Sequence, residues 1–254
     1  MARGDRIAAW MRQQLHAAGA RGFVVGLSGG VDSALVARLA QLAAPGNVLA
    51  AILPCHSDPQ DERDAAAVAD HFAIPRVRVD LSSAYDALVL GVQQALNSVP
   101  PQMRDTEPAD PLRGRVPIAN MKPRLRMTTL YYFANTLNYL VAGTGNRTEL
   151  AIGYFTKYGD GGCDLLPLGR LLKSEVRALA RELGVPPAVV DRTPSAGLWI
   201  GQSDEEEMGF TYADLERYLA EGPQGVPPAL AMRIERLIRM SDHKRELPPM
   251  PDES

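Results

Sequence analysis

The sequence predicts a single α/β domain, built on a doubly wound, Rossmann-like parallel sheet with helices on both faces. Short apolar runs alternate along the chain with segments in which apolar residues recur at helical spacing. Of its 254 residues, 46% are hydrophobic and 22% are charged, which is enough apolar material for one core. Alternating strands and helices favour a parallel sheet with right-handed crossovers.

Four runs have the length of strands. Residues 23–27, 48–53 and 137–142 are almost continuously apolar, which is typical of strands buried on both faces of a sheet. Residues 76–80 alternate between polar and apolar, and so predict a strand nearer an edge or a site.

Helical stripes lie between and after these runs. They cover residues 35–42, 65–72, 176–183 and 230–238. Gly184 and Pro186 end the third of these helices.

Three stretches interrupt the alternation. Residues 98–117 are rich in proline and charge and predict a long exposed loop. Residues 144–170 are rich in glycine, have no period, and are longer than a loop without function usually is. Residues 193–210 combine turn formers with four consecutive acids, and a tail with prolines follows residue 243. We expect one domain over residues 1–254, with functional loops.

Charge and composition exclude several classes of protein. The 27 basic and 30 acidic residues give a net charge of −3, without the basic excess of a typical nucleic-acid-binding protein. No apolar run is long enough to span a membrane, and no signal peptide is evident. Cys55 and Cys163 do not predict a disulfide framework or a cysteine metal site. We expect a cytoplasmic protein that binds neither nucleic acid nor membrane.

The strongest motif is Ser28-Gly29-Gly30-Val31-Asp32-Ser33, between the first strand and the first crossover helix. Open parallel sheets bind ligands at this end of their strands, and a helix N-terminus favours phosphate. The glycines allow the backbone to surround phosphate oxygens, and Asp32 is suited to hold Mg²⁺ beside them. An ordinary strand-to-helix turn with a capping residue is the alternative. The motif is not a Walker A loop, because no Gly-x-x-x-x-Gly-Lys-Ser/Thr occurs.

This motif resembles the pyrophosphate loop of the N-type ATP pyrophosphatases, which cleave ATP between its α and β phosphates to adenylate a substrate. Further motifs resemble the NAD synthetase family of that group, in order, from about residue 5 to 248. They are 122–127 (KPRLRM), 143–149 (GTGNRTE), 153–162 (GYFTKYGDGG), 194–199 (PSAGLW), 201–205 (GQSDE) and 243–245 (HKR). The resemblance implies an adenine nucleotide α-hydrolase-like fold. It also implies amidation of deamido-NAD to NAD with ATP and ammonia.

The resemblance also implies roles for individual residues. The residues expected to bind ATP are Gly26, Leu27, Ser28, Gly29, Gly30, Val31, Asp32, Ser33, Thr144, Lys173 and Ser195. Those expected to hold deamido-NAD are Arg124, Lys157, Asp164, His243 and Lys244. Asp32 and Glu149 match the ligands of Mg²⁺, and Lys173 provides a cation for the phosphates.

Simpler explanations exist for several of these residues. Lys173 could be a solvated surface lysine, Glu149 could merely cap the segment after it, and His243 could be an exposed histidine. A different ligase with the same loop, such as GMP synthetase or a tRNA sulfur transferase, is a rival. So is a nucleotide-binding protein without activity.

The expected reaction has two steps. The nicotinate carboxylate attacks the α-phosphate of ATP, and ammonia then displaces AMP from the adenylate, with Asp160 as a candidate general base. The site must exclude water from the adenylate, and residues 76–86 and 193–210 are candidate lids. Only about 20 residues precede the first strand, so no glutamine amidotransferase domain is expected and ammonia is the expected nitrogen donor.

A homodimer with deamido-NAD at the subunit interface is also implied by the resemblance. The segment 117–135 predicts a helix that carries both apolar residues and two arginines, Arg124 and Arg126. A helix packed against its symmetry mate could bury these apolar residues and direct Arg124 at a shared ligand. We therefore expect a C2 dimer around residues 117–140. An amphipathic surface helix is the alternative. The apolar positions are Ile118, Met121, Leu125, Thr128, Thr129 and Tyr132.

Overall fold

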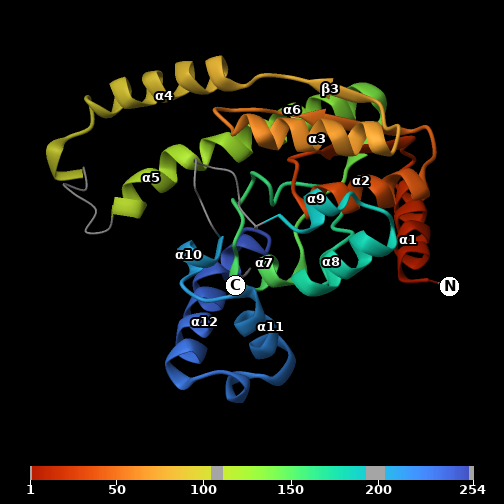
Figure 1. Ribbon diagram of the computed structural model, residues 1–254. Coiled ribbons are helices and arrows are strands. Elements are labelled where there is room, and N and C mark those ends of the chain that lie inside the picture. The colour runs from red at the N-terminus through yellow and green to blue at the C-terminus, as the bar shows by residue number, and fades with distance from the viewer. Residues whose placement is uncertain (1, 104–110, 193–203, 252–254) are drawn as a thin grey trace.

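The computed structural model describes residues 2–103, 111–192 and 204–251 (Figure 1). Side chains are described for the same residues except 101 and 111–114. No helix within these ranges is both long and apolar enough to cross a membrane.

Four parallel strands form the sheet of the described chain. They are β1 (Gly22–Gly26), β2 (Val48–Ile52), β3 (Arg76–Arg78) and β4 (Tyr139–Val141), in the order β3-β2-β1-β4. β3 lies at an edge, as its alternating sequence predicted. β1 neighbours β2 on one side and β4 on the other, so the chain changes direction across the sheet beside β1. Such a switch point is where open parallel sheets bind ligands, and it lies beside the 28–33 motif.

Helices cover both faces of this sheet, which confirms the predicted fold class. On one face the core contains residues of α1 (Arg3–Ala17), α2 (Val31–Ala43), α3 (Pro59–His71) and α8 (Lys173–Glu182). On the other face, α6 (Met121–Leu137) packs its Ala134 against Val24 and Val141. Four of these helices include or overlap predicted segments.

A third apolar cluster joins the helices of the C-terminal region, which lie together away from the sheet (Figure 1). Leu215 and Ile234 are fully buried at its centre. The elements are α7 (Arg147–Ile152), α10 (Asp204–Met208), α11 (Tyr212–Glu221) and α12 (Pro228–Ser241). Shorter elements are α9 (Pro187–Val190), η1 (Pro101–Met103), η2 (Pro223–Gly225) and η3 (Asp242–Lys244).

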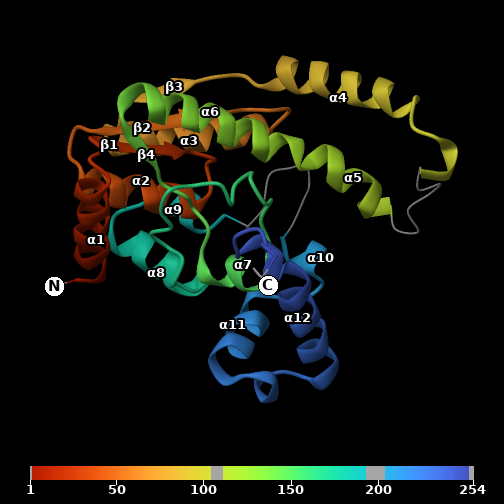
Figure 2. The same ribbon diagram turned by 180° about the vertical axis from the view of Figure 1, so that it is seen from behind.

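Two helices were not predicted from the sequence. α4 (Ser82–Leu96) and α5 (Pro111–Ala119) project from the sheet as an arm (Figure 2). The prediction of a loop over 98–117 was therefore wrong for its last third.

Two further predictions need correction or completion. The expected single helix over 117–135 is the end of α5 and most of α6, which meet at Asn120. The candidate lid 76–86 contains β3 and the first residues of α4. Residues 193–203 of the other candidate lid, 193–210, lie outside the described residues.

Candidate active site

The 28–33 segment forms a tight loop between β1 and α2. Gly29 has a φ of +84°, and a Cβ atom there would lie 2.5 Å from the carbonyl oxygen of Asp61. Ser33 Oγ donates to the carbonyl of Gly30 (2.9 Å) and accepts from the backbone N–H of Ser28 (3.2 Å). The loop is thus held in shape by its own hydrogen bonds, and only glycine fits at position 29.

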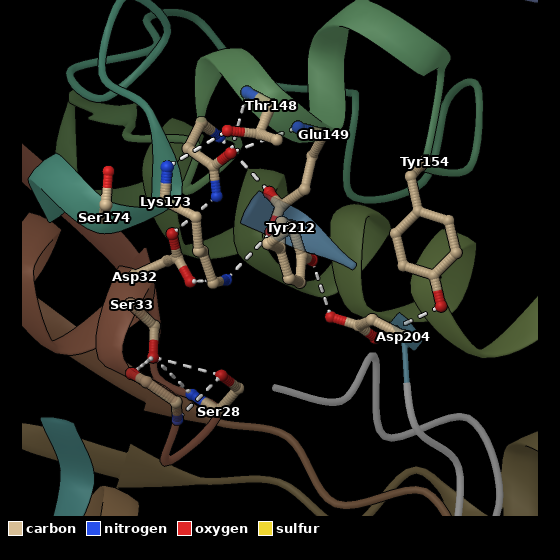
Figure 3. Close-up of polar contacts among 12 residues, drawn as sticks. Ser28, Asp32, Ser33, Thr148, Glu149, Tyr154, Lys173, Ser174, Asp204 and Tyr212 are labelled. Carbon is tan, nitrogen blue, oxygen red and sulfur yellow. Dashed lines mark hydrogen bonds and ion pairs between the residues drawn. The ribbon is translucent and has the colours of Figure 1, made fainter. Parts of the chain in front are cut away.

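Three charged side chains meet next to this loop (Figure 3). Lys173 Nζ lies 2.6 Å from Asp32 Oδ2 and 3.1 Å from Glu149 Oε1. Asp32 is in the first turn of α2, Glu149 in α7, and Lys173 at the start of α8. Lys173 is only 5% exposed, so it is not a solvated surface lysine. Glu149 does cap α7, through Oε2, while its Oε1 contacts Lys173.

The charges of this group depend on one another. Burial raises the pKa of Glu149 to about 7, because the nearby Asp32 adds to the cost of a buried negative charge and Lys173 offsets only part of it. Burial by itself would lower the pKa of Lys173, but the two carboxylates raise it above its usual value. Lys173 therefore stays an ammonium ion that two carboxyl groups share.

Asp32 and Glu149 suit a magnesium ion. Mg²⁺ prefers carboxylate oxygens and is held in proteins by one or two of them, together with phosphates and water. The gap between these two carboxylates already accommodates the ammonium group of Lys173, so it can hold a cation. No group of three or more His, Cys, Asp or Glu in the described residues could hold a metal alone. The remaining ligands would come from phosphate oxygens or water.

A cavity of about 440 Å³ opens beside these groups. Arg126 and Arg192 also line it. The residues expected at the ATP and magnesium sites that line this cavity are Gly26, Leu27, Ser28, Gly30, Val31, Asp32, Ser33, Thr144, Glu149 and Lys173. Gly29 lies in the same loop, and Ser195 is outside the described residues.

Asp160 and Lys244 line the same cavity. Asp160 Oδ1 accepts a hydrogen bond from the backbone N–H of Thr156 (2.9 Å). Protein atoms surround Asp160 and raise the pKa of its carboxyl, although the open cavity leaves the residue accessible to solvent. Lys244 Nζ donates to the carbonyls of Gly153 and Phe155, both at 2.7 Å.

The other residues expected to hold deamido-NAD do not line this cavity. Arg124 is exposed on α6 and donates to the carbonyl of Lys157 (3.3 Å), and Lys157 Nζ donates to the carbonyl of His243. These three form a separate polar cluster. Asp164 instead supports the sheet edge, where it accepts from the N–H of Val141 (2.7 Å) and the hydroxyl of Tyr131 (3.0 Å).

A buried polar network next to Lys173 was not predicted from the sequence. Asp204, 4% exposed, accepts from the hydroxyls of Tyr212 (2.8 Å) and Tyr154 (3.1 Å) (Figure 3). Tyr212 also places its ring under the Lys173 ammonium, 5.2 Å from the ring centre. Asp204 and Tyr154 lie in the matched motifs 201–205 and 153–162, but these motifs do not show that the two residues are partners.

Two arginines of the cavity wall were given no role in ligand binding from the sequence. Arg126 donates to the carbonyl of Leu53 (3.0 Å) and the hydroxyl of Ser57 (3.1 Å), so it is paired within its own chain. Arg192 pairs with Asp61 (2.5 Å) and Asp64 (2.9 Å), on the helix that supports Gly29. Of the two arginines on the predicted helix, Arg126 thus has partners within its own chain, and only Arg124 was expected to reach a shared ligand.

Comparison with known proteins assigns the chain to a family. Residues 4–248 match the family model for NAD synthase. An NH(3)-dependent NAD(+) synthetase from Carboxydothermus hydrogenoformans is 49% identical over 97% of this chain and 96% of the relative.

Two solved structures are similar over nearly the whole chain. An NMN synthetase from Francisella tularensis is 36% identical, with a TM-score of 0.87 over 98% of this chain and 97% of the other. An NAD+ synthetase from Burkholderia pseudomallei is 33% identical, with a TM-score of 0.73 over 96% and 89%. The fold, the phosphate-type loop and these matches together show that the chain belongs to the NAD synthase family of ligases.

Proposed function

We propose that the protein converts deamido-NAD to NAD by ATP-dependent amidation, with ammonia as the nitrogen donor. The observation that carries this proposal is the arrangement of Asp32, Glu149 and Lys173 around one cavity with the 28–33 loop. The naming of relatives as NH(3)-dependent, over nearly their full length, supports ammonia as the donor.

In the first step, an oxygen of the nicotinate carboxylate attacks the α-phosphorus of ATP. The bond between the α-phosphorus and the bridging oxygen breaks, and pyrophosphate leaves with that electron pair. The loop N–H groups and Lys173 stabilise the charge that develops on pyrophosphate, and such preorganised charge is usually the largest catalytic contribution. Mg²⁺ held by Asp32 and Glu149 would neutralise phosphate charge when bound.

In the second step, ammonia attacks the carbonyl carbon of the adenylate. AMP leaves with the electrons of the carbon–oxygen bond, and the new amide nitrogen gives up one proton. Asp160 is suited to take that proton, because it lines the cavity and desolvation by the surrounding protein atoms raises the pKa of its carboxyl. Free AMP, pyrophosphate and NAD are the products.

Similarity to an NMN synthetase favours a second candidate substrate. The same chemistry would make NMN from nicotinate mononucleotide. The polar cluster of Arg124, Lys157 and His243, outside the cavity, favours the dinucleotide because a longer substrate offers more phosphate and ribose to bind.

One assay separates these candidates. The protein is incubated with ATP, Mg²⁺ and ammonium, and with deamido-NAD, nicotinate mononucleotide or XMP in turn, while AMP and pyrophosphate are measured. The proposal expects both products only with deamido-NAD. Turnover with nicotinate mononucleotide alone would replace the substrate, and ATP binding without turnover of any acceptor would contradict an amidating activity.

We also propose a homodimer formed through the arm and α6. α4 is a largely apolar helix without a buried residue in the described structure, and large exposed apolar patches mark protein–protein interfaces. Arg124 projects from the adjoining α6, so a shared deamido-NAD could reach it. The exposed apolar side chains of this region, 41–74% accessible, are Leu88, Leu90, Val92, Leu96, Met103, Val116 and Tyr132.

A further inference from the structure

One fully buried asparagine contacts both carboxylates of the proposed magnesium site. Asn146 is 0% exposed and begins α7 as its N-cap residue. Its Nδ2 donates to Asp32 Oδ1 at 2.8 Å, across 114 residues of chain. Its Oδ1 accepts from the backbone N–H groups of Thr148 (3.0 Å) and Glu149 (3.1 Å).

The backbone of the same residue holds the other carboxylate. The N–H of Asn146 donates to Glu149 Oε2 at 3.2 Å, which leaves Glu149 Oε1 facing Lys173. Asp32 is held in a corresponding way, with Oδ1 on Asn146 and Oδ2 on Lys173. Each carboxylate thus has one oxygen fixed by Asn146 and the other oxygen toward the cation position.

Asn146 itself does not line the cavity, whereas Asp32, Glu149 and Lys173 all do. A carboxamide suits this position because one side of it donates and the other accepts. An aspartate here would place an oxygen against Asp32 Oδ1, and a serine would retain the helix cap without reaching Asp32. The amide also adds no charge to compete with a cation.

We infer that Asn146 is a positioning residue that sets the orientation of both magnesium-binding carboxylates before metal and ATP arrive. The inference rests on the proposed function, which places Mg²⁺ on Asp32 and Glu149. Residues that orient metal ligands typically change metal affinity by about 10-fold to 100-fold when they are replaced.

The test measures ligand affinity rather than turnover. Binding of α,β-methylene-ATP, which cannot be cleaved at the reacting bond, is measured by calorimetry with saturating Mg²⁺ and with EDTA. The ratio of the two dissociation constants gives the gain in affinity due to the metal. We expect Asn146→Ser to reduce this gain about 10-fold or more, with the EDTA affinity unchanged.

Two further variants make the result specific. Asp32→Asn should lose the gain, because it removes a proposed ligand. Thr211→Ala removes a capping box of the same type, at the start of α11. Because Thr211 contacts neither carboxylate, this variant should keep the gain.

Each alternative result of these binding measurements contradicts a different part of the inference. No metal-dependent gain in the unmodified protein would remove the proposed magnesium site itself. Loss of the gain in Asp32→Asn but not in Asn146→Ser would leave that site in place and overturn the role of Asn146. If Asn146→Ser weakened binding of the ATP analogue equally with Mg²⁺ and with EDTA, Asn146 would have a general structural role instead.

Discussion

Asp32 is the residue whose charge the proposed reaction needs most directly, since it contacts Lys173 and borders the phosphate loop. Asp32→Asn preserves the shape of the side chain and removes its charge. We expect adenylation to slow by at least about 10²-fold, or about 2.7 kcal/mol of transition-state stabilisation. Pyrophosphate release in the presence of deamido-NAD measures this step. A rate within tenfold of the unmodified enzyme would contradict the metal-ligand role.

Glu149 gives a pH dependence to stability. Its pKa in the folded protein is about 7, above the ordinary value of 4.5, so the folded state retains a proton that the unfolded state has lost between these values. The stabilising contribution of this proton is present below about pH 4.5 and is lost as pH rises through about 7. Urea unfolding of the metal-free protein should therefore show a larger fall in stability between pH 5 and 8 than Glu149→Gln shows. Equal falls would mean that Glu149 titrates normally.

Lys157 belongs to the cluster that we assign to deamido-NAD rather than to ATP. Its ammonium group donates to the carbonyl of His243, outside the nucleotide cavity. Lys157→Ala should raise the apparent KM for deamido-NAD much more than that for ATP. Steady-state kinetics with each substrate varied in turn measures both, and equal changes would place Lys157 in a different site.

The sequence identified the parts of the site that are contiguous in the chain. The loop at 28–33 has a recognisable order of residues, and resemblance supplied Glu149 and Lys173. Sequence analysis did not assign a role to Asn146, although it lies inside one of the matched motifs. Its partner Asp32 is 114 residues away, so its role depends on a contact that no local pattern records.

At the level of elements, the turn between β1 and α2 is tightly constrained at Gly29. Gly29 and Gly46 both have positive φ, +84° and +78°, but only at Gly29 would a Cβ meet a neighbour, the Asp61 carbonyl. Alanine at either position should cost about 1 kcal/mol of stability from its backbone conformation. Gly29→Ala should lose further stability and weaken ATP binding, whereas Gly46→Ala should bind ATP normally. Calorimetric ATP binding distinguishes the two, and equal affinities would mean that the loop adapts to the extra atom.

Several elements of the buried core were predicted from the sequence, whereas α1 and the arm were not. β1 and β2 have near-continuous apolar sequences because the sheet buries them on both faces. α4 was not predicted, although its apolar residues Tyr85, Leu88, Val92 and Leu96 recur at helical spacing. Of its residues, Tyr85 packs against the core on the α6 face of the sheet, and none is fully buried.

At the level of the whole molecule, the exposed apolar arm leads to a prediction about mass. Light scattering at micromolar concentration should give about twice the chain mass of 27.5 kDa. Leu90→Asp, which places a charge on α4, should shift the equilibrium toward the monomer. Leu247→Asp is the matched control, because Leu247 is 83% exposed near the C-terminus and belongs to none of these helices. A fully active monomer would contradict both the interface and a shared substrate site.

The distance along the chain between Lys173 and Asp32, 141 residues, has a consequence for biosynthesis. During translation, α2 and its phosphate loop leave the ribosome long before α7 and α8 are made. Until then the Asp32 carboxylate lacks both Asn146 and the ammonium ion that balances it, and the apolar face of α2 lacks α8. Closing so long a stretch of chain costs entropy, so contacts of this kind slow folding. A ribosome stalled before residue 173 therefore displays the phosphate loop without its Lys173 cation.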